Sequence, residues 1–116
     1  MSLTHKVKII GQASRRGFRT YTFTDRSPRL PKGYSLHFEA KTTAAFPYEV
    51  HWQVVNTGHE AASDNGLRGT FYPGEPGDRL LRTETTRYRG MHWIECFIVK
   101  NGVCVARSGE CLVNIE

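Results

Sequence analysis

The sequence predicts an all-β protein: a single antiparallel β-sandwich of the immunoglobulin-like (Ig-like) type with about eight or nine short strands. Two patterns predict this fold. Apolar and polar residues alternate over short segments, as in half-buried strands, and glycine, proline and Asn-Gly turns separate these segments. No segment carries an apolar stripe at helical spacing. The 116 residues suffice for one core, so residues 1–116 are expected to form a single domain.

The N-terminal part, residues 1–46, is basic and carries no motif that we can place. Three strands are expected in it, at Val7–Ile10, Phe18–Thr24 and Tyr34–Lys41. The third is the clearest, because one of its faces is apolar throughout, with Tyr34, Leu36, Phe38 and Ala40. Turns are expected between these strands, at Gly11, Gly17, Pro28 and residues 31–33.

Three further strands are expected in the central part, at Tyr48–Asn56, Thr70–Tyr72 and Leu80–Tyr88. In the first of them Val50, Trp52 and Val54 share one face, which predicts that Trp52 anchors the core. The segment Gly58–Gly66 has the best local helix propensity, but it is too short for a stable helix. At most one helical turn is expected there.

The C-terminal part is expected to form strands at His92–Val99, Val103–Arg107 and Cys111–Ile115. Asn101-Gly102 predicts a type I′ hairpin turn between the first two, because this turn needs positive φ at both central residues. A regular two-residue hairpin would pair Lys100 with Val103, Ile98 with Val105 and Cys96 with Arg107. The other face would carry Trp93, Glu95, Phe97 and Val99 beside Cys104, Ala106 and Ser108. Both faces would then be largely apolar, so a cover is expected over the second: a loop, a ligand, a dimer mate, the rest of a longer chain or the N-terminal segment.

The charge of the chain is unevenly distributed. The net charge is +5, and the first 32 residues hold eight lysines and arginines against one acidic residue, Asp25. Such a segment attracts phosphate or an acidic protein surface, although a solvated basic face that aids solubility explains it equally well. Three cysteines without Cys-x-x-Cys spacing are expected to be reduced core residues of a cytoplasmic protein. No apolar run is long enough to cross a membrane, and no secretory signal is seen.

Catalytic and metal-binding motifs are absent from the sequence. It has no His-Glu-x-x-His, Gly-x-Ser-x-Gly, phosphate-binding loop or dinucleotide fingerprint. On a strand His92 and Glu95 would point to opposite faces, which argues against a shared metal. We therefore expect a protein that is not an enzyme, with no metal and no cofactor.

Several separated motifs resemble one known family. They are Trp-x-Val-x-Asn-x-Gly from Trp52, Leu67-Arg68-Gly69, and Tyr-x-Gly-x-His-Trp-x-Glu-Cys-Phe from Tyr88. Together they cover residues 47–116, about the last 70, and resemble the adenylyl/guanylyl cyclase and SMODS C-terminal sensor domain. The resemblance implies a non-enzymatic all-β module of bacterial antiphage systems, proposed to sense nucleotides or related ligands and usually appended to a nucleotidyltransferase domain. No such domain precedes it here, so the chain is expected to be an excised domain or to act alone.

Chemistry applied to the motif positions predicts a set of ligand-binding residues. They are Asn56, Arg68, Tyr88, His92, Trp93, Glu95 and Arg107. A purine would stack on Trp93, the carboxylate of Glu95 would accept from its exocyclic amine, and Arg68 would contact phosphate. In the structural alternative, Arg68 and Glu95 form a partly buried ion pair that ties a loop to the hairpin. Taken singly, each arginine is better explained as a surface charge and each tryptophan as a core residue.

Two functions follow as hypotheses. In the first, the chain binds a nucleotide or a cyclic oligonucleotide. In the second, the apolar hairpin docks on a partner domain or on a second copy in a homodimer, and the basic N-terminus contacts an acidic surface. Nonspecific binding of nucleic acid by the basic segment is a third hypothesis, which charge alone supports.

Overall fold

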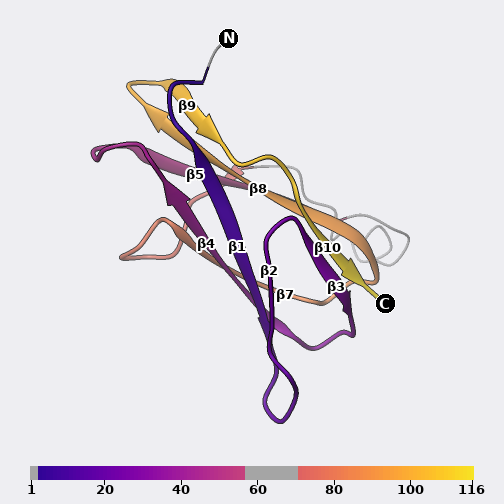
Figure 1. Cartoon of the computed structure of the whole chain (residues 1–116). Coiled ribbons are helices and arrows are strands. Elements are labelled where there is room, and N and C mark those ends of the chain that lie inside the picture. The colour runs from indigo at the N-terminus through magenta and orange to yellow at the C-terminus, as the bar shows by residue number, and fades with distance from the viewer. Residues whose placement is uncertain (1–2, 57–70) are drawn as a thin grey trace.

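The computed structural model describes residues 3–56 and 71–116, which form two packed sheets (Figure 1). These residues contain ten strands: β1 Val7–Ser14, β2 Tyr21–Phe23, β3 Arg26–Leu30, β4 Ser35–Thr42, β5 Glu49–Val55, β6 Phe71–Tyr72, β7 Leu81–Thr85, β8 Gly90–Lys100, β9 Val103–Arg107 and β10 Cys111–Ile115. One sheet has the order β2-β1-β4-β7, and the other has the order β3-β10-β8-β5-β6, with β9 also paired to β8. The predicted all-β sandwich is confirmed. The predicted helical turn at Gly58–Gly66 lies outside the described residues.

The core lies between the two sheets and is built by the alternation that predicted them. β4 buries Leu36 and Phe38 on one face, and β8 buries Ile94 and Ile98 on the face opposite. Trp52 is fully buried, as predicted, and its indole Nε1 donates a hydrogen bond to the carbonyl oxygen of Arg79 at 3.0 Å. A buried tryptophan needs such a partner for its N–H.

Gly11 lies inside β1 and not in a turn, so the turn predicted there is wrong. The ring of Phe23, on the neighbouring β2, occupies the space beside Gly11, and a Cβ at this position would lie 2.5 Å from the Cε2 atom of Phe23. Glycine here permits close packing of a ring on the backbone. β1 therefore continues to Ser14.

The turn predicted at Pro28 is also wrong, because Pro28 lies within β3. This strand forms the edge of the six-stranded sheet and runs parallel to β10, the one parallel pair among the described strands. An edge strand tolerates proline because one side of its backbone has no strand to bond. The hydroxyl of Ser27 takes over one ladder bond, accepting from the backbone N–H of Asn114 at 2.9 Å.

The hairpin turn at Asn101-Gly102 is confirmed, but the predicted register beyond it is wrong. Asn101 and Gly102 have φ values of 52° and 76°, as a type I′ turn requires, and Lys100 pairs with Val103. Ile98 then pairs with Ala106 instead of Val105, and Phe97, instead of Cys96, pairs with Arg107. One extra residue in β9 forms a β-bulge. Each residue of β9 after the bulge therefore points to the face opposite the predicted one.

The bulge decides what covers the outer face of β8. Ala106 turns into the core, where it is fully buried, and Arg107 turns to the outer face. There the guanidinium of Arg107 lies 5.1 Å from the ring centre of Phe97. The ring centre of Phe71, in β6, lies 5.3 Å from that of Phe97. Side chains of β6 and β9 thus supply part of the expected cover.

In residues 3–56 and 71–116 we find no helix with the length and apolar character needed to span a membrane.

Candidate functional site

A small recess opens between the two sheets, where β5 ends and β8 begins. Its polar lining comes from Asn56 after β5, Glu84 and Thr85 of β7, and His92 of β8, with Trp93 beside them. Its apolar lining comes from both sheets: Leu36, Phe38, Val54, Ile94, Val113 and Ile115. The enclosed volume is about 20 Å³, which is room for about one water molecule. A larger ligand would therefore lie over the mouth.

His92 is the most buried polar group of this recess, with 5% of its surface exposed. Its Nε2 lies 2.6 Å from the backbone carbonyl oxygen of Tyr88, and because a carbonyl only accepts, Nε2 carries the hydrogen. Burial lowers the pKa of His92 below its ordinary value of 6.5, and the hydrogen bond to Tyr88 opposes that shift only in part. His92 is thus neutral at pH 7 and holds the Thr86–Arg89 loop at the recess.

Acidification is expected to destabilise the protein through His92. The unfolded chain takes up a proton near pH 6.5, before the folded chain does, because the folded pKa is lower. The free energy of unfolding therefore falls as the pH drops below 6.5 until the folded pKa is passed, by at most about 1.4 kcal/mol per pH unit. Urea titrations between pH 7.5 and 5 measure this loss.

The matched controls for this prediction are two glutamine variants. His92→Gln keeps a donor for the Tyr88 carbonyl and is expected to flatten the pH dependence. His37→Gln changes an exposed histidine and is expected to follow the wild type. Parallel curves for wild type and His92→Gln would contradict the assignment.

An ion pair that the sequence interpretation missed lies on β7 beside the recess. The Arg82 Nη2 and Glu84 Oε2 atoms are 2.7 Å apart, with side chains only 17% and 12% exposed. Arg82 also donates to the Pro73 carbonyl oxygen at 3.1 Å and lies over the ring of Tyr72 at 4.9 Å. The sequence could have predicted this pair, because Arg-x-Glu on a strand places the two opposite charges on the same face.

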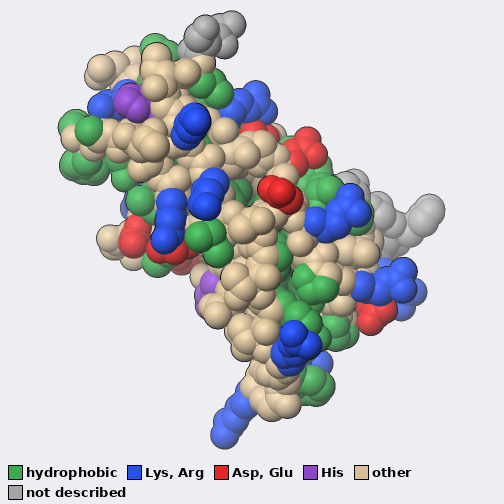
Figure 2. Space-filling model, in the orientation of Figure 1, with side chains coloured by type: hydrophobic (Ala, Val, Ile, Leu, Met, Phe, Trp, Pro, Cys, Tyr) green, Lys and Arg blue, Asp and Glu red, His purple; other side chains and the backbone are tan. Residues whose placement is uncertain are grey.

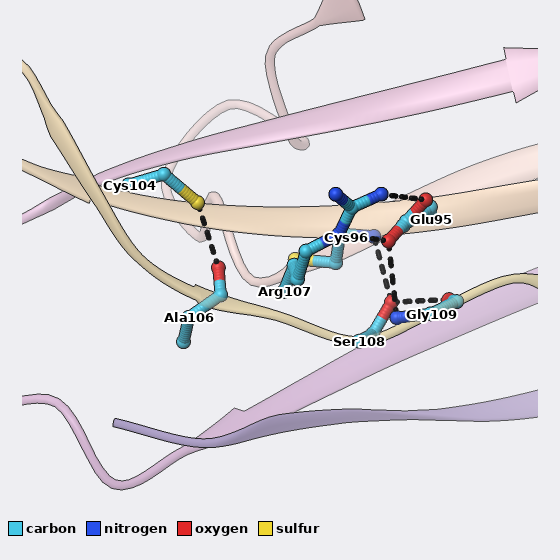
Figure 3. A network of polar contacts seen from close by, with 7 residues as sticks. All are labelled: Glu95, Cys96, Cys104, Ala106, Arg107, Ser108 and Gly109. Atoms are coloured by element: carbon cyan, nitrogen blue, oxygen red, sulfur yellow. Dashed lines mark hydrogen bonds and ion pairs between the residues drawn. The ribbon is translucent and has the colours of Figure 1, made fainter. Parts of the chain in front are cut away.

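A second cluster lies further along β8, on its outer face (Figure 3). Glu95 is 3% exposed, and its two carboxylate oxygens accept from Arg107 Nε at 2.9 Å and Nη2 at 3.2 Å. The backbone N–H of Gly109 also donates to Glu95, at 3.1 Å, and Ser108 Oγ accepts from the N–H of Cys96 at 2.9 Å. The hydrogen bonds to Glu95 and its negative charge raise the pKa of Arg107. This network fixes the turn between β9 and β10.

The structure divides the predicted ligand residues into two groups. Asn56, His92 and Trp93 line the same recess, and Tyr88 adjoins it through its carbonyl group. Glu95 and Arg107 form the separate ion pair on the outer face of β8, which gives Glu95 a structural partner. Arg68, its predicted partner in the structural alternative, lies outside the described residues.

The buried cysteines lack the character of nucleophiles. Burial raises the pKa of Cys96 and of Cys111 to about 12, with further contributions from the charges of Glu95 and Asp25. Both stay protonated at neutral pH, and all three cysteines are free thiols. The part of the chain that the structure describes holds no group of three His, Cys, Asp or Glu residues arranged for a metal ion.

The two sheets and the recess at their end define a small β-sandwich module. A scan against models of known families then gives its family: residues 1–116 match the Adenylyl/Guanylyl and SMODS C-terminal sensor domain. The chain belongs to this family. The match spans the whole chain, including the first 46 residues, so the resemblance to residues 47–116 was too narrow in extent. No curated protein and no solved structure matches the chain significantly.

Proposed function

We propose that the chain is a non-enzymatic sensor that binds a nucleotide or a cyclic oligonucleotide in the cytoplasm, as part of a bacterial antiphage system. The observation that carries the proposal is the match of the whole chain to a sensor domain named after adenylyl and guanylyl chemistry. The family name also describes a C-terminal domain, which supports a linked nucleotidyltransferase domain as the partner that reads the sensor.

The mouth of the recess is the proposed ligand site. Asn56 provides an amide that both donates and accepts. Trp93 adjoins the recess but alternates with His92 and Ile94 along β8, so its half-buried indole lies on the outer face, where a base that extends over the mouth can stack on it. Tyr88 and His92 position the adjoining loop. We assign the phosphate contact to Arg68, as the sequence chemistry suggests.

Calorimetric titration with mono-, di- and cyclic nucleotides tests the proposal. Trp93→Ala is expected to weaken binding about 5- to 150-fold, because base stacking on an aromatic ring contributes about 1–3 kcal/mol. Phe46→Ala is the matched control, since Phe46 is 80% exposed and does not line the recess. The absence of heat with every nucleotide at high micromolar concentration would rule the proposal out.

A protein-interaction module is the second candidate. It is favoured by the apolar side chain of Phe71, which is 55% exposed and lies against Phe97 on the outer face of the larger sheet. Such a surface suits a partner domain or a second copy of the chain. A dimer whose mass by light scattering depends on concentration, without any response to nucleotides, would favour this reading.

A further inference from the structure

A basic groove lies where the two sheets meet, at the opposite end of β8 from the recess. Its positive charges come from Lys6 just before β1, Lys8 in β1 and Lys41 near the end of β4. Arg107 at the end of β9 also lines it, with its guanidinium paired to Glu95. Figure 2 shows lysine and arginine side chains gathered over this part of β1 and β4. The groove has an open volume of about 670 Å³, within the range of about 300–1,000 Å³ found for small-molecule sites. No carboxylate lines it.

The sheet register places two of these cations directly opposite each other. Lys8 on β1 pairs with Lys41 on β4, and like charges at directly opposed positions destabilise a sheet. Among the described residues no carboxylate forms an ion pair with Lys6, Lys8 or Lys41. Glu39 follows on the same face, opposite Ile10, and is not part of the lining. An anion bound between the two lysines would remove the repulsion.

The walls of the groove are held by hydrogen bonds to the backbone of residues 5 and 6. The N–H of Lys6 donates to Thr43 Oγ1 at 2.9 Å, and Thr42 Oγ1 donates to the Lys6 carbonyl oxygen at 2.8 Å. The N–H of His5 donates to the carbonyl oxygen of Val105 at 2.9 Å, which ties the segment before β1 to β9. The cations are therefore presented from a fixed frame.

The lining indicates which anion the groove would take. It contains three lysines, His5, and Arg107 in its pair with Glu95, but no tryptophan, tyrosine or phenylalanine, so it offers positive charge more than surface for stacking a base. We propose that the groove binds a compact polyphosphate group, such as the phosphates of a nucleoside di- or triphosphate, with Lys8 and Lys41 on either side of it. This site is separate from the recess and does not depend on the function proposed there.

Titration of the whole chain with inorganic tripolyphosphate tests the site. Binding is expected at low salt and to weaken as salt is added. Lys8→Ala and Lys41→Ala are each expected to weaken it about tenfold, the effect of losing one hydrogen bond to a charged group. ATP is expected to compete and adenosine is not. If tripolyphosphate does not bind the wild type, the proposal is overturned.

Two variants make the test specific. Lys8→Glu is expected to abolish binding and to raise Tm by about 1 to 4 °C, because it replaces a repulsive cross-strand pair with an attractive one. Arg16→Ala with Arg26→Ala removes two exposed positive charges outside the groove and is expected to leave binding unchanged. If this control loses as much tripolyphosphate affinity as the lysine variants, binding is due to unspecific charge attraction and the proposed site is wrong.

Two further results separate this site from other ligands and from the recess. Oligothymidylate is tested as a probe for nucleic-acid binding. If its affinity grows with its length and tripolyphosphate does not compete with it, the groove binds a nucleic-acid backbone and the proposal of a compact polyphosphate ligand is overturned. Trp93→Ala is expected to bind tripolyphosphate like the wild type, since Trp93 does not line the groove. The two proposals can therefore fail independently: loss of nucleotide binding at the recess leaves tripolyphosphate binding at the groove unchanged.

Discussion

Replacing Trp52 with alanine is expected to lower the free energy of unfolding by about 3 to 5 kcal/mol. Trp52 has no exposed surface and lies opposite Cys96 of β8 and Tyr72 of β6. The variant would lose the transfer free energy of the indole and leave a cavity between the sheets. It would also remove the donor that satisfies the carbonyl oxygen of Arg79. Urea unfolding followed by circular dichroism measures the change.

Two further variants separate packing from hydrogen bonding at this position. Trp52→Phe retains most of the buried ring but lacks the N–H, so it is expected to cost less than the alanine variant. Trp93→Ala removes an indole that is only partly buried and is expected to cost less as well. A Trp52→Ala protein that melts like the wild type would show that this face of β5 is not the core.

Replacing Arg107 with alanine is expected to lower the free energy of unfolding by about 1.5 to 3 kcal/mol. Glu95 is buried, and the variant would remove the cation that pairs with its carboxylate. The lower end of this range applies if solvent replaces the guanidinium, because the Arg107 side chain is itself 54% exposed. Equilibrium urea unfolding measures the loss.

A double-mutant cycle tests whether the pair acts as a unit. Glu95→Ala, Arg107→Ala and the double variant are expected to give a coupling of about 0.5 to 3 kcal/mol, with the double variant less destabilised than the sum of the single ones. Glu95→Ala that binds nucleotide less tightly but unfolds like the wild type would contradict this and return Glu95 to the ligand site.

Local pattern predicted the parts of the fold that local chemistry determines. Alternation along β4 and β5 predicted two half-buried strands and the buried position of Trp52, and Asn101-Gly102 predicted its turn. The turns assigned to Gly11 and Pro28 were wrong because tertiary neighbours decide these positions. A ring of β2 packs on Gly11, and β10 recruits the segment around Pro28 as an edge strand.

The candidate sites were predictable only where one stretch of sequence forms them. His92 and Trp93 are adjacent in the chain, and both line the recess. The Glu95–Arg107 pair was missed because it depends on a one-residue bulge that no local signal marks. The basic groove was missed because Lys8 and Lys41 meet only through the pairing of β1 with β4.

The parallel pairing of β3 with β10 has a consequence for the order in which the molecule is made. Leu30 pairs with Ile115, so the larger sheet joins an early segment of the chain to a late one. Contacts so distant in sequence slow folding, because a long loop must close before they form. During synthesis the β3 segment emerges long before β10 can pair with it. Until β10 emerges, β3 has no partner strand in the larger sheet, and the proline and the two arginines of β3 protect this unpaired segment against pairing with other chains.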